Sequence, residues 1–418
     1  MSDHQARFID VDELRVGMYI YLDLGWIGHP FALNNFKIVS DSQIETIRGL
    51  GLKRLRWSPE HSDLATPDTA STAADTAGEA RSPTAERRQR LLDQQASLAR
   101  CEREFSDATR TFRDILKLVQ TQPKPARERA EAMVDDLVGK LLDQGECFIR
   151  LLSEKAGEKS SLHAINVTAI ALLLGKSLGL DAAALKLLGL GALLHDIGKI
   201  ELPERLRWRD DGFNAAERKL FQQHVDHGVE LAARMGIEAE ACGIIAQHHE
   251  YVDGSGFPRQ LSGESLTQAS RILGLVNYYD NLCNPANPVA AITPHKSLSL
   301  MFAQFRQKFD ADILGVFIRM MGVYPPGSMV VLTDGRHALV VSVNSSRPLK
   351  PRVLIHDPRI PRDDALVVDL EDEPALGIRR SLKPDQLPRA VFDYLSPGQR
   401  ICYFFERARN PLDRRGSR

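Results

Sequence analysis

The sequence predicts a mainly α-helical protein with a small N-terminal α/β domain and a short β-rich C-terminal domain. Three observations support this fold class. Apolar residues recur at helical spacing almost throughout the middle of the chain, from about 126 to 325. Short runs of alternating apolar and polar residues, typical of strands, occur near both ends. With 418 residues, the chain is long enough for two or three domains with their own cores.

Composition narrows the class of protein. With 54 basic and 55 acidic residues, the chain gives no sign of a nucleic-acid polymer or a membrane as partner. The longest apolar stretches are too short to span a bilayer, and the polar N-terminus carries no signal peptide. Five scattered cysteines without a CxxC pair are typical of a reducing compartment. We therefore expect a cytoplasmic protein.

The first segment, residues 1–62, alternates in the manner of strands at MYIYLDL, FKIVS and LKRLRW, with a short helix between the last two. This pattern predicts a small α/β domain with a regulatory role. Residues 63–84 are small, polar and proline-containing, which is typical of a flexible linker.

A connecting helix is predicted over residues 85–125, because apolar residues recur there at heptad spacing. The two seam positions are occupied by Leu91, Leu98, Phe105, Phe112 and Val119, and by Cys101, Ala108 and Ile115. One interpretation is a homodimer through helix 86–120. The other is a helix that packs on its own domain, and Gln94 in the seam weakens the dimer interpretation. We expect no metal ligand from this helix or from the N-terminal domain.

The predicted helical domain covers residues 126–325. Asp181 is expected to begin one of its helices, and Asn214 with Glu217 forms a capping-box pattern before another. Residues 326–408 are predicted to form the β-rich C-terminal domain, with strands at MVVLTDG, HALVVSV, RVLIHD and ALVVDL. No catalytic group is evident in that last segment.

Six of the twelve histidines fall between positions 163 and 249, in a region otherwise rich in leucine and alanine. A single histidine such as His227 is more often solvated, so we leave it out. The remaining candidates each lie on or at the end of a separate predicted helix, as the ligands of one metal site would: His163, His195, Asp196, His224, His248 and His249.

The kinds of side chain in this set indicate the chemistry. Neutral imidazoles with a carboxylate suit iron, manganese or zinc better than calcium or magnesium. A carboxylate beside a histidine ligand is able to bridge two ions. Two such ions recur in proteins that cleave phosphoesters, because one generates hydroxide while both hold the oxygens of the displacement.

The stretches HDIGK at 195–199 and HHEYVDGSGFP at 248–258 resemble the HD-GYP family of metal-dependent phosphodiesterases. The resemblance extends over residues 126–325 and includes H-x3-G at His224 to Gly228 and the closing GVYPPGSMVVLTDG. It implies an all-helical HD-type bundle. The N-terminal FIDVDELRVGMYI resembles the small domain that often precedes this family's catalytic domain.

The resemblance also implies an activity: hydrolysis of the cyclic dinucleotide cyclic di-GMP to linear pGpG or GMP at an iron or manganese centre. Asp196 would bridge the ions, and Lys199 would face a substrate phosphate as a point charge. Gly254 and Gly256 would shape the substrate loop, whereas Asp253 is expected only to bond its own turn. The implied metal ligands are His163, His195, Asp196, His224, His248, His249 and the residue at position 277.

The sequence departs from the family pattern at several of these positions. Phe257 replaces the signature tyrosine, and Lys159 stands where three-metal members carry a glutamate, so we expect two divalent ions, iron or manganese. Asn277 replaces an aspartate ligand, which weakens the first metal site. Asp280 could substitute for that ligand, but a capping or salt-bridging role is favoured. The family's Arg-Pro-Tyr segment is replaced by CNPANPVA, with Ala286 near the arginine position.

Three hypotheses therefore remain open. The first is a two-metal cyclic di-GMP phosphodiesterase with reduced activity. The second is a catalytically degenerate module that binds metal, nucleotide or a protein partner. The third is a phosphohydrolase of another nucleotide. The intact HD and HH pairs favour the first, while Asn277 and Ala286 favour the others.

Overall fold

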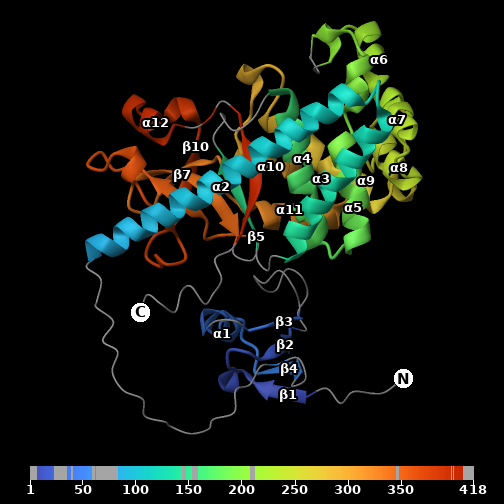
Figure 1. Ribbon diagram of the computed structural model, residues 1–418. Coiled ribbons are helices and arrows are strands. Elements are labelled where there is room, and N and C mark those ends of the chain that lie inside the picture. The colour runs from blue at the N-terminus through green and yellow to red at the C-terminus, as the bar shows by residue number, and fades with distance from the viewer. Residues whose placement is uncertain are drawn as a thin grey trace, which may run out of the picture. The chain divides into compact units, whose positions relative to one another are not determined.

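The computed structural model describes residues 7–22, 35–38, 41–58, 62, 83–143, 147–152, 159–207, 212–344, 348–396, 398 and 400–407. The chain divides into two compact units, Met1–Arg81 and Ser82–Arg418. Helices dominate the second unit, and strands lie in the first unit, at Cys147–Leu152 and towards the end of the second unit (Figure 1). The fold class predicted from the sequence is therefore confirmed.

The N-terminal unit is a four-stranded antiparallel sheet in the order β1-β4-β2-β3, with one helix. Its elements are β1 (Arg7–Asp10), β2 (Tyr19–Tyr21), β3 (Asn35–Lys37), α1 (Asp41–Arg48) and β4 (Arg54–Ser58). Ile20, Ile38 and Ile47 are fully buried and form the centre of its small core. The predicted linker at 63–84 lies almost wholly outside the described residues.

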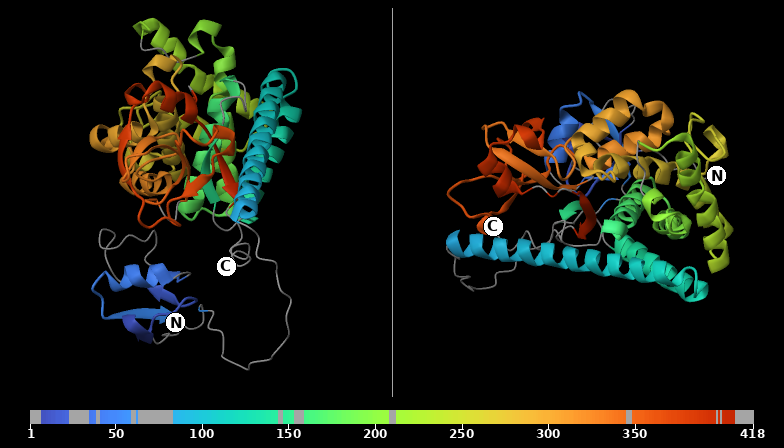
Figure 2. Two further views of the ribbon diagram at one scale, coloured as in Figure 1. Left: turned by 90° about the vertical axis from the view of Figure 1, so that its left-hand side faces the viewer. Right: turned by 90° about the horizontal axis from the view of Figure 1, so that it is seen from above.

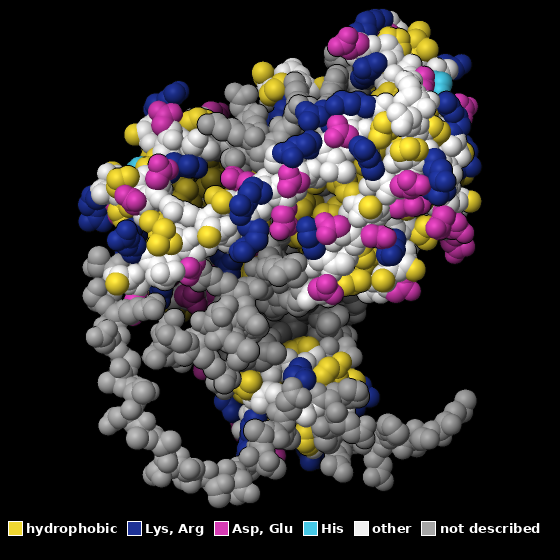
Figure 3. Space-filling model, viewed as in Figure 1, with side chains coloured by type: hydrophobic (Ala, Val, Ile, Leu, Met, Phe, Trp, Pro, Cys, Tyr) yellow, Lys and Arg dark blue, Asp and Glu magenta, His cyan; other side chains and the backbone are white. Residues whose placement is uncertain are grey.

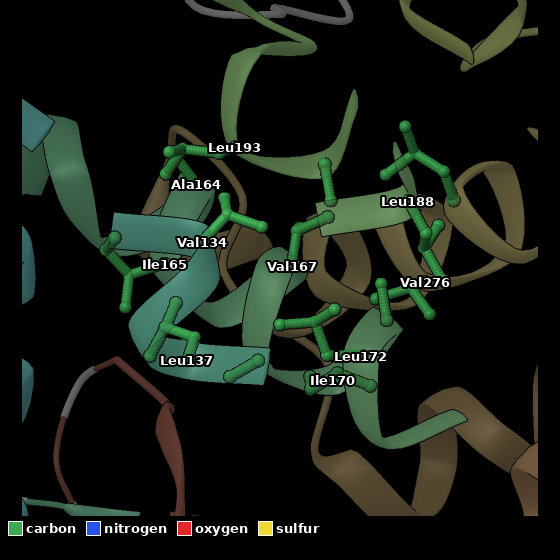
Figure 4. Packing of buried hydrophobic residues seen from close by; sticks show 14 of the residues in the cluster. Val134, Leu137, Ala164, Ile165, Val167, Ile170, Leu172, Leu188, Leu193 and Val276 are labelled. Atoms are coloured by element: carbon green, nitrogen blue, oxygen red, sulfur yellow. The ribbon is translucent and has the colours of Figure 1, made fainter. Parts of the chain in front are cut away.

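The helical part of the second unit comprises α2 (Pro83–Leu118), α3 (Pro123–Asp143), α4 (Lys159–Ser177), α5 (Ala182–Leu194), α6 (Ala215–Gln222), α7 (His224–Met235), α8 (Ala239–Gln247), α9 (Gln268–Cys283), α10 (Pro294–Gln304) and α11 (Ala311–Met321). Asp181 caps α5, and Asn214 with Glu217 forms a capping box on α6, both as predicted. Helices α3, α4, α5 and α9 bury their apolar side chains against one another (Figure 4). The same core includes apolar side chains of α7 and α8, so it positions these helices relative to α4 and α5.

The strands of the second unit form a single antiparallel sheet with the path β10-β6-β7-β5-β11, while β8 pairs with β7 and β9 with β8. They are β5 (Cys147–Leu152), β6 (Met329–Leu332), β7 (His337–Asn344), β8 (Arg352–Ile355), β9 (Val367–Asp369), β10 (Ile378–Leu382) and β11 (Cys402–Arg407), and α12 (Arg389–Leu395) precedes β11. Strand β5 lies within residues 126–325, which were expected to be almost wholly helical, and it was not predicted. A six-residue apolar run is too short for its periodicity to separate strand from helix.

The long helix α2 runs along one side of the unit, from the C-terminal strands to the helical bundle (Figure 2). Its heptad seam is buried within the chain, since Phe105, Phe112 and Ile115 belong to the main core. Gln94 pairs through its amide with the backbone N–H and carbonyl of Val367, at 2.9 and 2.8 Å. The helix therefore packs on its own unit. A homodimer through helix 86–120 stays a prediction, but the buried seam residues would not form its interface.

The outer face of this part of the molecule is mixed in charge. Lys and Arg side chains are interspersed with Asp and Glu over α2 and α3 (Figure 3). Among the helices that the structure describes, none is long and apolar enough to cross a membrane. The division of the second unit into a connecting helix, a helical domain and a β-rich domain stays a prediction, because the structure groups all three in one compact unit.

Candidate metal centre

Five of the seven predicted ligands lie at helix ends, whereas His163 and Asn277 lie inside helices α4 and α9. His195 is the C-cap of α5 and His248 is the C-cap of α8, so Asp196 and His249 are the first residues after those helices. His224 is the first residue of α7. His163 differs, because it lies in the second turn of α4. The fold thus brings residues from four helices to one place.

Two glycines make this convergence possible. A Cβ at Gly198, in the 3-10 turn Ile197–Glu201, would collide with the carbonyl oxygen of His224. A Cβ at Gly256 would overlap the backbone of Glu250. The glycine of the HDIGK motif therefore lets the turn after Asp196 lie against the start of α7.

The first group of candidate ligands consists of His163, His195 and Asp196, whose ligand atoms lie within 4.8 Å of one another. The Nε2 atoms of the two histidines are 3.2 Å apart. Oδ2 of Asp196 lies 3.3 Å from Nε2 of His195 and 3.6 Å from Nε2 of His163. This arrangement fits one half of a two-ion site.

The second group consists of Asp196, His224, His248 and His249. Nε2 of His224 lies 3.3 Å from Nε2 of His248. The other oxygen of Asp196, Oδ1, faces these two atoms at 3.5 and 3.8 Å. Each oxygen of the Asp196 carboxylate therefore faces a different pair of histidines, which is the geometry that a bridging ligand requires.

Hydrogen bonds determine which ring nitrogen faces the centre. Nδ1 of His195 and Nδ1 of His248 each donate to the backbone carbonyl three residues earlier, at 2.7 Å, and Nδ1 of His224 does the same. Each Nε2 then carries no hydrogen, and its lone pair is directed at the other candidate ligands. Two nitrogens that bind one metal at 2.0–2.1 Å lie roughly 3–3.4 Å apart, which matches the observed spacings.

The electrostatics favour the ligand forms of these side chains. Burial lowers the pKa of His224 to about 4 and holds the pKa values of His248 and His249 well below their usual range. Burial alone would raise the pKa of Asp196, but the Lys199 ammonium and His195 outweigh it and hold that pKa well below its ordinary value. At neutral pH the second group is thus three neutral imidazoles and a carboxylate, as metal binding requires.

Two atoms of the site support the fit to a cation. Nε2 of His249 and Oδ1 of Asp196 are buried and have no hydrogen-bond partner among the described residues. Buried polar atoms are nearly always paired, so unpaired ones call for a specific explanation. A divalent ion between these two atoms would supply it, and the residues present therefore fit the predicted metal.

The residues predicted to contact substrate lie around this centre. Nζ of Lys199 donates to Oδ2 of Asp196 at 2.6 Å and lies 5.5 Å from the centre of the Phe221 ring. Phe257, in the place of the signature tyrosine, stacks on His249 with ring centroids 4.4 Å apart. Gly254 has a φ of +75°, a conformation that side chains rarely adopt. The substrate-binding roles of Lys199, Gly254 and Gly256 stay predictions.

The loop after the paired histidines is organised by two carboxylates. Oδ1 of Asp253 accepts a hydrogen bond from the backbone N–H of Ser255 at 2.9 Å, as expected for a residue that bonds its own turn. Glu250, which the sequence reasoning did not single out, is 2% exposed and accepts from the backbone N–H groups of Arg259 and Leu261 at 2.7 and 3.0 Å. The sequence feature that could have pointed to Glu250 is its position directly after His248 and His249.

Helix α9 carries Asn277, the predicted seventh ligand position, and Asp280, which was considered as its substitute. Asn277 is 2% exposed, and its Oδ1 accepts from Nδ2 of Asn281 at 2.7 Å. Asp280 is fully buried and accepts from Nδ1 of His163 at 2.6 Å. The favoured role for Asp280, as a cap or ion-pair partner, was therefore too general: it is the hydrogen-bond partner of a predicted ligand, a relation between residues 117 positions apart that no local pattern reveals.

Comparison with protein families matches residues 123–313 to the HD domain and residues 7–130 to a domain of unknown function. Among curated proteins, the chain is 25% identical over 356 residues to a cyclic di-GMP phosphodiesterase of Pseudomonas aeruginosa, covering 83% of this chain and 84% of that protein. It is 28% identical to 3'3'-cGAMP-specific phosphodiesterase 1 of Vibrio cholerae over 159 residues, which are 38% of this chain and 37% of that protein.

An HDG"Y"P protein from Bdellovibrio bacteriovorus matches 74% of this chain and 97% of its own, at 13% sequence identity and a TM-score of 0.43.

Proposed function

We propose that this chain, which carries an HD domain of the HD-GYP type, is a metal-dependent phosphodiesterase that hydrolyses cyclic di-GMP to linear pGpG or GMP. The observation that carries the proposal is the Asp196 carboxylate, whose two oxygens face two different pairs of histidines. The similarity to a cyclic di-GMP phosphodiesterase over more than four fifths of both chains supports the substrate.

The residues that would hold the two ions are His163 and His195 on one side, His224, His248 and His249 on the other, and Asp196 between them. Their neutral imidazole and carboxylate donors suit iron or manganese. When bound, two such ions supply a hydroxide at neutral pH and stabilise the attacking and leaving oxygens of the phosphodiester.

The chain itself contributes position and charge. Lys199 is about one fifth exposed and reaches the same side of the site as Oδ2 of Asp196, so its ammonium is placed to offset charge on a substrate phosphate. The Phe257 ring, stacked on His249, covers that ligand with an apolar surface and limits the access of water to it. No arginine follows α9 in CNPANPVA, so phosphate contacts from that segment would be made without a guanidinium.

A second candidate function is a catalytically degenerate module that binds a nucleotide or a protein partner. Asn277 favours it, because its amide oxygen is uncharged and already accepts a hydrogen bond from Asn281. Such a module would bind metal at the second group of ligands and would turn over no cyclic dinucleotide.

The test starts with protein purified without oxygen, whose metal content is measured before hydrolysis of cyclic di-GMP and 3'3'-cGAMP is assayed. His248→Ala, His249→Ala and Asp196→Ala should each lose metal and any activity, and Asp196→Ala should lose most because its carboxylate serves both ions. His227→Ala is the matched control, since His227 lies on α7 but outside the cluster. Full metal content in all three variants would overturn the proposal.

A further inference from the structure

We propose that the start of the C-terminal strand β11 is part of the metal centre's support: through Asn166, Asn284 and Asp280 it orients His163 towards the first ion. Asp280 and the two asparagines are then positioning residues, not ligands. The inference rests on the proposed metal centre and adds to it a hydrogen-bond relay from the β-sheet. We call Asn166 and Asn284 the asparagine clamp.

His163 needs a partner that the other ligands do not need. His195, His224 and His248 lie at helix ends, and their Nδ1 atoms bond backbone carbonyls three residues earlier. His163 lies inside α4, where backbone carbonyls are already used by the helix. Its Nδ1 is instead 2.6 Å from Oδ2 of Asp280. A carboxylate only accepts, so this bond places the hydrogen on Nδ1 and leaves Nε2 free to bind a metal.

The carboxylate of Asp280 is fixed through its second oxygen as well. Oδ1 accepts from Nδ2 of Asn166 at 3.1 Å and from Nδ2 of Asn284 at 2.9 Å. Asn166 lies one turn after His163 in α4, and Asn284 is the C-cap of α9, one turn after Asp280. All three bonds of this fully buried carboxylate therefore go to protein groups, which holds it as an orienting group and not as a ligand.

Both asparagines are tied to the backbone at the start of β11. Asn166 donates to the carbonyl of Ile401 at 2.7 Å and accepts from the N–H of Tyr403 at 2.8 Å. Asn284 donates to the same carbonyl at 2.9 Å and accepts from the N–H of Ile401 at 2.8 Å. Each amide thus uses both of its N–H bonds and its oxygen. The backbone donors fix which side of each amide is oxygen, so the remaining N–H must point at Asp280.

This relay explains why asparagine stands at both positions. Only an amide both donates to a carboxylate and pairs with a backbone N–H and carbonyl. Strand β11 is in turn held by its pairing with β5 over Cys402–Arg407 and by Phe404, whose ring lies 5.9 Å from that of Phe105 on α2. The position of His163 therefore depends on the C-terminal strand and on the helix that packs against it.

The first test determines which ring nitrogen of His163 carries the hydrogen, in the full-length protein without metal. In protein labelled with nitrogen-15 at histidine, the His163 signal is assigned by its loss in His163→Gln. We expect the hydrogen on Nδ1 in the wild type and a shift towards Nε2 in Asp280→Asn, because an amide in that place can donate to Nδ1. An unchanged His163 signal in Asp280→Asn would overturn the inference, whatever metal the protein binds.

The second test reads metal affinity in the Asn277→Asp background, where the first site has a full set of ligands. There Asp280→Asn and Asn284→Leu should each weaken the more weakly bound ion about 10- to 100-fold in a manganese titration, as is usual for residues that orient a ligand. The more tightly bound ion should be unchanged. Thr168→Val is the matched control, since it removes a buried hydrogen bond of α4 that lies outside the relay.

The outcomes separate the two proposals. If both ions bind Asp280→Asn as tightly as the parent, the relay does not position His163 and the inference fails. If the parent binds no ion at all, the proposed function fails, and the histidine signal still decides the inference. A Thr168→Val variant that loses the weaker ion to the same extent would show a general effect of stability and would also overturn the inference.

Discussion

At the scale of single residues, the proposed function makes Asn277 the residue that limits the site. The family resemblance places a metal-ligating aspartate there, and the structure places a buried amide whose oxygen accepts from Asn281 at 2.7 Å. The second group of ligands has three histidines and a share of Asp196. The first has only two histidines and the other share, so the two candidate metal sites differ in their number of donors.

Restoring the aspartate should therefore strengthen the weaker half. Asn277→Asp adds a negative charge at the first ion, and we expect metal content to rise from about one ion per chain towards two. Hydrolysis of cyclic di-GMP should rise with it, because the displacement needs an ion on each of its two oxygens. The measurement is metal stoichiometry and turnover for the wild type and the variant side by side.

Two results would contradict this view of Asn277. A wild type that already holds two ions and cleaves rapidly would show that the amide is a competent ligand. A variant with two ions and no turnover on any cyclic dinucleotide would move the defect to the missing Arg-Pro-Tyr segment, and the degenerate module would become the better proposal.

His224 makes the stability of the metal-free protein depend on pH. Burial lowers the pKa of this histidine to about 4 from 6.5, so the unfolded chain takes up its proton first as pH falls. The stability that this group contributes is complete above pH 6.5 and is lost between pH 6.5 and about 4. The full loss is on the order of 3 kcal/mol, at 1.36 kcal/mol per pKa unit. Urea unfolding of metal-free protein should show about 2 kcal/mol of this loss between pH 7 and pH 5, since part of the titration lies below pH 5, and His224→Gln should reduce it.

Some residues of the site were within reach of sequence reasoning and others were not. The HDIGK and HHEYVDGSGFP motifs are local, so the candidate ligands His195, Asp196, His248 and His249 and the self-bonded turn at Asp253 could be proposed from them. His163 and His224 were selected because they lie on other predicted helices of the same region. Asp280 was noticed only through its distance from Asn277 along α9. Its partner His163 and the clamp residues Asn166 and Asn284 belong to distant segments, and a hydrogen bond between distant segments leaves no periodic signal in the sequence.

At the scale of elements, the sequence predicted helices and caps better than strands. The caps at Asp181 and Asn214 follow from short-range chemistry and are present. Strand β5 was missed because its six residues are mostly apolar and lie between long helices. Strands β10 and β11 were missed as well. Strand β11 matters for the site because Ile401, just before it, and Tyr403 within it bond the asparagine clamp.

The heptad seam of α2 illustrates a pattern with two meanings. Apolar residues at seven-residue spacing predict that one face of the helix is buried. They do not indicate whether that face packs on a second chain or on the rest of the same chain. In the structure Phe105 is fully buried and its ring meets Phe404 of β11. The seam is thus part of the core that supports the metal centre.

Phe105→Ala should therefore destabilise the folded chain without changing its oligomeric state. Truncation of a buried phenylalanine typically costs about 3–5 kcal/mol, because apolar contacts are lost and a cavity is left. Urea unfolding measures the cost, and light scattering at several concentrations measures the mass. Leu92→Ala, at a position on the same helix that is 51% exposed, is the control and should cost little. A fall in mass with unchanged stability would instead indicate that the seam holds a dimer.

At the scale of the whole molecule, the boundary between the two compact units lies before α2. The structure places Ser82–Arg418 in one compact unit, although the sequence suggested that the connecting helix and the β-rich segment were separate from the helical domain. Pairing of β5 with β7 and β11 joins the segment before α4 to the end of the chain. The helices that carry the candidate ligands are therefore supported by β5, from the first part of this unit, and by β7 and β11, from its last part.

This boundary predicts how the chain tolerates shortening. A fragment of residues 83–418 keeps every candidate ligand, the asparagine clamp and the buried seam of α2, so it should fold and hold as much metal as the full chain. A fragment that begins at residue 125 loses Phe105, Phe112 and Ile115 from the main core, each at most 3% exposed, and we expect it to unfold or aggregate. Circular dichroism, thermal unfolding and metal analysis of the two fragments beside the full chain provide the measurement.

A folded fragment 83–418 without metal would place a ligand in the N-terminal unit. A folded, metal-loaded fragment 125–418 would show that α2 is an accessory helix and that the predicted boundary after it was correct.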